Sequence, residues 1–227
     1  MQTTDRKAEF YRQARLRVQD LAKNLTEDQL SVQNKACPDW TVRDTLYHLA
    51  GEAKDVSTGN MEHAPGRKWS DRQIAERQGN SIEDTISEWD EFATKLEPMI
   101  AVEDRMTFVV ADVACHEIDI QAALGLPIDK DNELVTWTAT SFVKVMDYKL
   151  KQTELAAIKI TTKDNEWTAG EGKHEIALEV PNTFELMRGA CGRRSLDQIR
   201  SWTWSGDPEP YLEHISVFKP RAEALTE

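Results

Sequence analysis

Apolar residues recur every three or four positions through most of the first 125 residues. This spacing places them on one face of an α-helix and predicts a series of amphipathic helices. The main predicted helices cover residues 5–24, 41–58, 81–98 and 104–124, with a short helical piece starting at Ser70 and polar connections such as 26–30. Four helices joined by moderate connections are typical of a four-helix bundle.

The pattern changes after Pro127. A further helix is predicted over residues 133–150, but residues 155–162 alternate and are rich in β-branched side chains, which indicates a strand. Further strands and short helical segments are predicted at residues 167–172, 174–180, 181–191, 195–202 and 211–218, with a turn at 204–208. The predicted fold class is α+β, mainly α, with a four-helix bundle over residues 1–127 and a small α/β domain over residues 128–227.

The fourth predicted helix combines an apolar surface with charge. Its apolar side chains, from Phe108 to Leu124, are distributed around nearly the whole circumference of the helix, which is typical of a buried helix. Asp112, His116 and Asp119 nevertheless fall on one stripe, because spacings of four and three residues bring side chains to one face. Buried carboxylates and imidazoles must be paired, hydrogen-bonded or bound to an ion. Cys115 points away from this stripe, and we expect it to fill the core.

The second predicted helix places a histidine at the edge of the core. Thr41 is a good N-cap, and Asp44 gives a capping-box-like pattern three residues later. His48 lies between the apolar face of this helix and a polar stripe, and Glu52 follows one turn further along. A histidine in such a place needs a partner from another element before it indicates a binding site.

Bundle cores are a recurrent place for metal sites, because facing helices project ligands inward. His48, Asp112 and His116 offer two imidazoles and one carboxylate, a set that suits zinc with a fourth position open to water or substrate. Asp119 would then orient one imidazole as a hydrogen-bond acceptor. The alternative has no metal: Asp112 and His116 form a buried ion pair, and His48 bonds a carboxylate of its own helix.

Composition makes nucleic-acid-binding, membrane-spanning and disulfide-rich classes of protein unexpected for this sequence. A net charge of −12, without a basic stripe, makes nucleic acid an unexpected partner. No apolar run approaches the ~18 residues that span a bilayer. The first residues have no signal-peptide pattern, so we expect a cytoplasmic protein without a membrane partner. Three cysteines at wide spacings favour reduced thiols over disulfides. The oligomeric state stays open, a homodimer included.

Two helical motifs carry a family resemblance. The segment Trp40-Thr-Val-Arg-Asp-Thr-Leu-Tyr-His48-Leu-Ala-Gly51, preceded by Cys37-Pro-Asp, resembles the N-terminal signature of the mycothiol-dependent maleylpyruvate isomerase family. That family is a branch of the DinB-like four-helix bundles. Asp112-Val-Ala-Cys-His116 through Pro127 is similar to its second segment, in which a carboxylate four residues before a histidine supplies metal ligands. Phe184 to Ser195 and Trp204 to Pro208 resemble its C-terminal unit.

The resemblance implies roles for individual residues. His48, Asp112 and His116 would bind zinc or another divalent metal. The family normally has glutamate at the position of Asp112, and aspartate has the same charge but one methylene less reach. Arg193, in the Gly-Arg-Arg motif, is a candidate contact for a substrate carboxylate or for the thiol cofactor, because a guanidinium can clamp a carboxylate with two hydrogen bonds. Its alternative is a structural arginine that caps a carbonyl or pairs with an acidic neighbour.

The family's chemistry depends on mycothiol, a low-molecular-weight thiol. By resemblance, the protein would be a metal- and mycothiol-dependent isomerase or S-transferase that acts on a small electrophile. The main alternative is a non-catalytic DinB-like metal-binding or stress-response module, with Asp112 as the departure that would mark it. A third interpretation is a metal-dependent hydrolase with Glu52 as general base.

Overall fold

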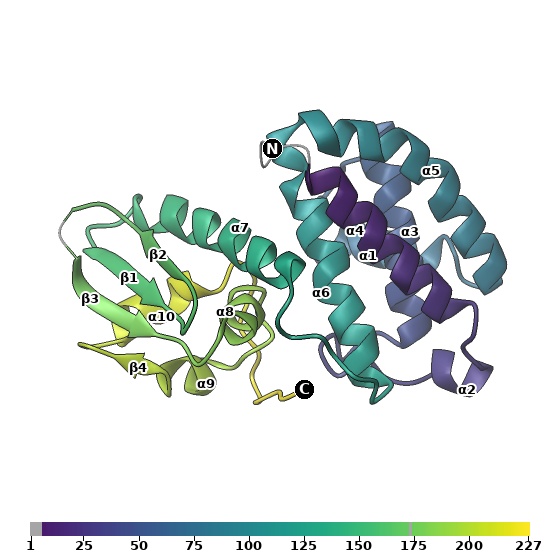
Figure 1. The fold of residues 1–227 in the computed structure, drawn as a ribbon. Helices are drawn as coiled ribbons and strands as arrows, with labels where there is room; N and C mark the ends of the chain where they lie inside the picture. Colours follow the sequence, from purple (N-terminus) through teal and green to yellow (C-terminus); the bar gives the residue numbers. More distant parts are fainter. Residues whose placement is uncertain (1–5, 173) are drawn as a thin grey trace. The chain divides into compact units, whose positions relative to one another are not determined.

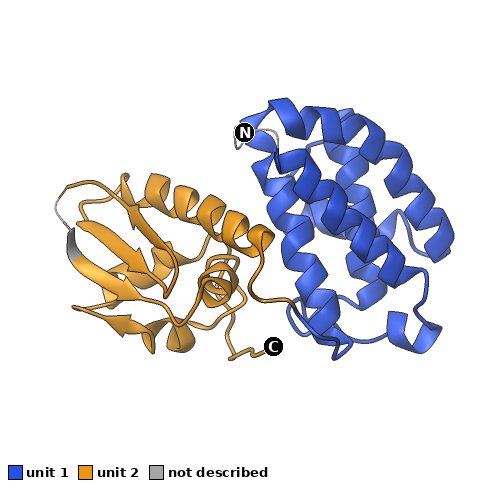
Figure 2. Cartoon of the chain, viewed as in Figure 1, with its two compact units in different colours: residues 1–128 blue, residues 129–227 orange. Residues whose placement is uncertain are grey.

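The computed structural model describes residues 6–172 and 174–227. The chain divides into two compact units, one that ends at Ile128 and one that spans Asp129–Glu227 (Figure 2). This division falls one residue after the boundary predicted from the change in sequence pattern. None of the described helices is both long and apolar enough to cross a membrane.

Over its described residues, 6–128, the first unit has four long helices and two short ones. Figure 1 shows their arrangement. In chain order they are α1 (Arg6–Ala22), α2 (Glu27–Leu30), α3 (Val42–Thr58), α4 (Arg67–Ala75), α5 (Ile82–Val102) and α6 (Thr107–Ala123), with a 3-10 turn at Asp104–Met106 before α6. The long helices pack as a bundle in which α1 and α3 each contact both α5 and α6. The predicted four-helix bundle is therefore confirmed.

Local sequence signals fix the start and end of α3. The Thr41 hydroxyl accepts a hydrogen bond from the Asp44 backbone N–H at 3.1 Å, and the Asp44 carboxylate accepts one from the Thr41 N–H at 2.9 Å. These two bonds satisfy backbone donors that the first helical turn leaves without partners. Gly59 ends the helix with φ of 78°, a left-handed conformation that glycine adopts without strain. The predicted capping box is confirmed.

Three boundaries differ from the prediction. Residues 27–30 form α2, which Thr26 caps, where a polar connection was expected. Helix α4 begins at Arg67 after Gly66, so Ser70 lies inside the helix and does not cap it. Helix α5 continues beyond Pro98 to Val102.

Burial explains the third difference. Pro98 cannot donate a backbone hydrogen bond, but Leu96 and Ile100 on either side are fully buried, and their packing holds the helix together. The structure also corrects one side chain of α6. Phe108 is 37% exposed, because it points away from the buried side of the helix, where Val109 and Val110 are fully covered.

The second unit is a four-stranded sheet with helices. Its elements are α7 (Glu133–Leu150), β1 (Ala157–Thr161), β2 (Glu166–Ala169), β3 (His174–Glu179), α8 (Thr183–Ala190), α9 (Leu196–Arg200), β4 (Thr203–Trp204) and α10 (Glu209–Ile215). The strand order is β2-β1-β3-β4, with β1 parallel to β3 and the other neighbours antiparallel. Helix α7 packs against β2 and α8. The sequence analysis missed β4, which depends on pairing of Trp204 with Leu178 and lies where a turn was predicted.

The bundle core contains one polar pair among its largest side chains. Trp89 on α5 donates a hydrogen bond from its indole N–H to the Tyr11 hydroxyl on α1 at 2.9 Å, and both residues are 1% exposed. A buried tryptophan normally needs such a partner. The bond joins α1 to α5.

Candidate metal centre

The three predicted metal ligands lie together in the bundle. His48 projects from α3, and Asp112 and His116 project from successive turns of α6. The Nε2 atom of His48 lies 3.0 Å from Oδ2 of Asp112, and the Nε2 atom of His116 lies 3.7 Å from Oδ1 of the same carboxylate. Each residue offers one ligand atom, and these three atoms lie within 4.8 Å of one another. Both imidazoles are buried, and Asp112 is half-buried.

A chain of polar contacts fixes the protonation of His48. The side-chain amide of Gln73 on α4 donates from Nε2 to Oδ2 of Asp55 at 2.9 Å, so its Oε1 atom faces Nδ1 of His48 at 2.8 Å. A carbonyl oxygen only accepts hydrogen bonds, and Nδ1 of His48 must therefore carry a proton. Asp55 is itself held by Arg72 at 2.9 Å and by Asn60 at 2.8 Å.

With the proton on Nδ1, the Nε2 atom of His48 and the Asp112 carboxylate face each other as two hydrogen-bond acceptors. In neutral His48 the Nε2 atom has a lone pair, and it points at the Asp112 carboxylate. The contact is favourable only if a proton or a metal cation lies between the two groups.

The geometry also fits a cation. Ligand atoms around a tetrahedral zinc ion lie about 3.3 Å apart, which follows from bonds of about 2.0 Å. The two nitrogen-to-carboxylate distances, 3.0 and 3.7 Å, fall on either side of this value. The donor set and its geometry fit a divalent metal ion held by His48, Asp112 and His116, and aspartate is long enough to reach both imidazoles.

Aromatic rings cover the two imidazoles. The Trp40 ring centroid lies 4.9 Å from that of His48 and 5.7 Å from that of His116. Trp69 meets His48 edge-on with centroids 6.2 Å apart. Trp69 is buried, and its indole N–H has no hydrogen-bond partner among the described residues. Its N–H is a donor that a bound ligand or water can use.

Asp119 lies where it can orient His116. Its Oδ2 atom is 3.1 Å from Nδ1 of His116, and its side chain is fully buried one turn further along α6. Metal-bound histidines commonly have such a carboxylate beside the nitrogen that does not face the metal. The two atoms are not aligned for a hydrogen bond among the described residues, so the supporting role of Asp119 stays a prediction.

Glu52 lies on α3 one turn beyond His48 and is almost completely buried. Burial raises the pKa of Glu52 well above its ordinary value, and the negative charges of Asp112 and Asp55 raise it further. The carboxyl group therefore favours the neutral, protonated form. A general base must be deprotonated to act, so this environment favours a proton donor over the base predicted from the sequence.

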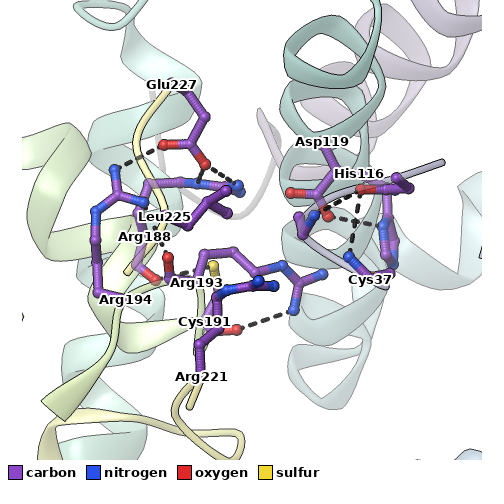
Figure 3. Close-up of polar contacts among 12 residues, drawn as sticks. Cys37, His116, Asp119, Arg188, Cys191, Arg193, Arg194, Arg221, Leu225 and Glu227 are labelled. Carbon is purple, nitrogen blue, oxygen red and sulfur yellow. Dashed lines mark hydrogen bonds and ion pairs between the residues drawn. The ribbon is translucent and has the colours of Figure 1, made fainter. Parts of the chain in front are cut away.

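Arg193 belongs to the second unit. It is half-buried, and its Nη1 atom donates a hydrogen bond to the Cys191 carbonyl oxygen at 3.2 Å, the carbonyl-capping contact considered as its structural alternative. The next residue, Arg194, is 1% exposed and pairs with Glu185. It also pairs with Glu227, as Figure 3 shows. The two adjacent arginines thus differ in their surroundings: Arg193 is half-buried, whereas Arg194 belongs to a buried network of ion pairs.

The cysteines form no disulfide within the described part of the chain, as predicted. Cys115 and Cys191 are buried, whereas Cys37 is half-buried in the loop before α3. A sulfur of Cys37, a ring nitrogen of His116 and an oxygen of Asp119 also lie within 4.8 Å of one another. Sequence reasoning did not single out Cys37.

Sequence reasoning also missed Gln73, Asp55 and Trp69. One local signal was available. Gly51 lies on α3 where a Cβ atom would come within 2.5 Å of the Gln73 Cβ atom. A glycine inside an amphipathic helix indicates a close approach by another element. Which residue makes that approach depends on the packing of α4.

The fold and this cluster define a class of protein: a helical bundle with a two-histidine, one-carboxylate cluster, followed by a small α/β unit. Residues 11–108 match the mycothiol maleylpyruvate isomerase N-terminal domain. This match covers most of the first unit and includes His48, Glu52 and Gln73. The resemblance to the mycothiol-dependent maleylpyruvate isomerase family predicted from the sequence is confirmed.

Two solved structures have the same fold across both units. One is a crystal structure of a histidine-to-alanine mutant of the mycothiol-dependent maleylpyruvate isomerase, with a TM-score of 0.59 and 11% sequence identity. The aligned region covers 90% of the present chain and 93% of the mutant's chain. A second crystal structure of the mycothiol-dependent maleylpyruvate isomerase has a TM-score of 0.55 at 10% identity, with the same coverage. No curated protein sequence matches the chain.

Proposed function

We propose that this protein is a metal- and thiol-dependent enzyme that uses mycothiol to isomerise, or to attach to sulfur, a small electrophilic substrate. The observation that carries the proposal is the convergence of His48 and His116 on the Asp112 carboxylate, with the His48 tautomer set by Gln73. Residues 11–108 match the mycothiol maleylpyruvate isomerase N-terminal domain, and this match supports mycothiol as the thiol.

Each residue has a role in holding the ion. His48 and His116 offer neutral nitrogen ligands, and Asp112 offers a negative oxygen that offsets part of the charge. Two nitrogens and one oxygen favour zinc and leave one coordination position open. When bound, a divalent ion there favours the thiolate form of a thiol at neutral pH, and the thiolate is the nucleophilic form.

Other residues shape the surroundings. Gln73 keeps the proton of His48 on Nδ1, so that Nε2 stays available as a ligand. Trp40 and Trp69 cover the imidazoles and reduce their contact with water. Glu52 holds a proton close to Asp112 and is the candidate to deliver it to a reacting carbon or oxygen. Arg193 is proposed to bind a carboxylate of the substrate or the thiol cofactor.

Metal analysis tests the first step of the proposal. Protein purified without chelator is expected to contain about one equivalent of zinc or another divalent metal, and His48→Ala should lose most of it. His214→Ala, at a half-exposed histidine on α10, is the matched control and should keep its metal. An unchanged metal affinity in the His48→Ala variant, or no metal in the unchanged protein, would overturn the proposal.

The fate of the thiol separates the two reactions. In an isomerisation the thiolate adds to an activated double bond and leaves again after rotation, so the thiol is recovered. In an S-transfer the sulfur displaces a leaving group and stays attached. Mass spectrometry of the products formed from mycothiol and a panel of maleyl and alkyl-halide electrophiles distinguishes them. If no electrophile reacts although metal is bound, the non-catalytic metal-binding module is the better interpretation.

A further inference from the structure

A second group of potential ligands shares His116 with the proposed metal centre. It consists of Cys37 in the loop before α3, together with His116 and Asp119 on α6, and these residues lie side by side in Figure 3. One ligand atom from each lies within 4.8 Å of the other two. Sulfur, imidazole nitrogen and carboxylate oxygen are the three ligand types that proteins use to bind zinc.

The two nitrogens of His116 face two different carboxylates. Nε2 lies 3.7 Å from Asp112, whereas Nδ1 lies 3.1 Å from Asp119. Nδ1 is buried, and among the described residues it has no aligned hydrogen-bond partner. A buried polar atom without a hydrogen bond costs free energy unless a ligand or ion satisfies it. This nitrogen therefore points to a ligand position on the Asp119 side of the ring.

The loop holds Cys37 in a defined place. The Cys37 backbone N–H donates to the carbonyl oxygen of Asn34 at 3.0 Å, and the Trp40 N–H donates to the Cys37 carbonyl oxygen at 2.8 Å. Asn34 is fully buried, and its side-chain amide donates to the Thr45 hydroxyl on α3 at 3.0 Å. These bonds fix the turn against α3, which keeps the thiol beside His116.

We propose that Cys37, Nδ1 of His116 and Asp119 form a second metal position, specific for a thiophilic divalent cation such as Zn²⁺ or Co²⁺. Neutral imidazole has one lone pair, so His116 can serve only one position at a time. An ion on the Asp119 side moves the ring proton to Nε2, toward Asp112, and an ion on the Asp112 side moves it to Nδ1. The protein therefore holds one ion that alternates between a thiolate-containing and a thiolate-free ligand set.

Cobalt distinguishes the two positions, because a Co²⁺–thiolate bond gives a charge-transfer absorption band in the near ultraviolet. The full chain, stripped with chelator and loaded with Co²⁺ in the absence of any thiol, is expected to show this band at one equivalent. Asp112→Asn weakens only the first position, so it should increase the band about twofold or more. Cys37→Ser should abolish the band while about one equivalent of Co²⁺ stays bound.

Cys115→Ala is the matched control, because Cys115 is buried beside His116 and should leave the band unchanged. The second position is overturned if the unchanged protein gives no band at saturating Co²⁺, or if the band survives in Cys37→Ser. If the protein binds two equivalents of Co²⁺ at once, a single ion does not alternate between the two positions. If Cys37→Ser loses all Co²⁺, the protein has a single metal centre that includes the Cys37 thiol. The inference rests on the proposed function only through His116: a band lost in Cys37→Ser would support it even if no thiol-dependent reaction is found.

Discussion

The Nδ1 atom of His48 donates a hydrogen bond to the Oε1 atom of Gln73 at 2.8 Å, and this bond decides which nitrogen of His48 can bind a metal. Gln73→Leu removes the acceptor with little change in volume. We expect metal affinity to fall about 10- to 100-fold, the usual effect of losing such a supporting contact. Competition with a chromophoric chelator measures it. Gln13→Leu, at an exposed glutamine of α1, should leave the affinity unchanged, and equal affinities in the two variants would contradict the prediction.

Asp112 contacts both imidazoles, and its charge should matter more than its length. Asp112→Asn keeps the shape and removes the charge, so metal affinity is expected to fall at least about tenfold. Asp112→Glu introduces the residue normal for the family, and we expect it to keep one equivalent of metal. Metal analysis after dialysis checks both. Retention of metal by the asparagine variant without a stronger Co²⁺–thiolate band would show that Asp112 is not a ligand.

Gly51 permits the close approach of α4 that places Gln73 beside His48. A Cβ atom on residue 51 would lie 2.5 Å from Cβ of Gln73 and 2.8 Å from Nη1 of Arg77. Gly51→Ala should therefore push α4 outward, lower the free energy of unfolding by about 1–3 kcal/mol, and weaken metal binding.

Thermal unfolding and chelator competition measure both effects. Gly206→Ala is the control, because its added Cβ atom would meet only Ile176 at an ordinary 3.8 Å. A Gly51→Ala variant as stable as the original protein would show that α4 yields without cost.

Substitutions of the adjacent residues Arg193 and Arg194 should affect function and stability differently. Arg194 pairs with Glu185 and Glu227 in a buried network, so Arg194→Ala should lower the melting temperature strongly. Arg193 is half-buried, and we expect Arg193→Ala to unfold within a few degrees of the original protein.

If Arg193 binds a carboxylate of substrate or cofactor, the same variant should raise KM about tenfold or more while metal content stays constant. Steady-state kinetics with a reactive electrophile gives the answer. Unchanged kinetics would leave Arg193 with the structural role of bonding the Cys191 carbonyl.

The Glu227 carboxylate makes stability depend on pH. Burial alone would raise the pKa of Glu227, but Arg188 and Arg194 outweigh it and lower the pKa below the ordinary 4.5. The unfolded chain therefore takes up this proton at a higher pH than the folded chain. The stabilisation is complete above the unfolded pKa and is lost as pH falls through the folded pKa.

Glu227→Gln should lower the free energy of unfolding by about 3 kcal/mol at pH 7, because it leaves buried arginine charge without its partner. The difference from the original protein should shrink as pH falls from about 5 toward 3. Denaturant titrations at several pH values measure it, with Glu223→Gln at an exposed position as control. A difference that does not change over this range would rule out Glu227 as the titrating group.

The sequence by itself determined the four long helices of the bundle, the capping box of α3 and the placing of Asp112 and His116 on one face of α6. These features are local, because helix periodicity and capping depend on residues three or four positions apart. The same locality explains what was missed. The ends of α4 and α5, and strand β4, depend on packing against distant elements, which overrides local preference.

Only the tertiary structure decided the surroundings of the candidate centre. Gln73 comes from a short helix with no distinctive motif, and it reaches His48 because Gly51 lets α4 approach α3. Cys37 comes from a loop, and its place beside His116 depends on the buried Asn34. The ligand stripe of α6 could be predicted because helical geometry orders its residues. The group that sets the tautomer of His48 could not, since Gln73 lies on a segment that only the packed bundle brings beside α3.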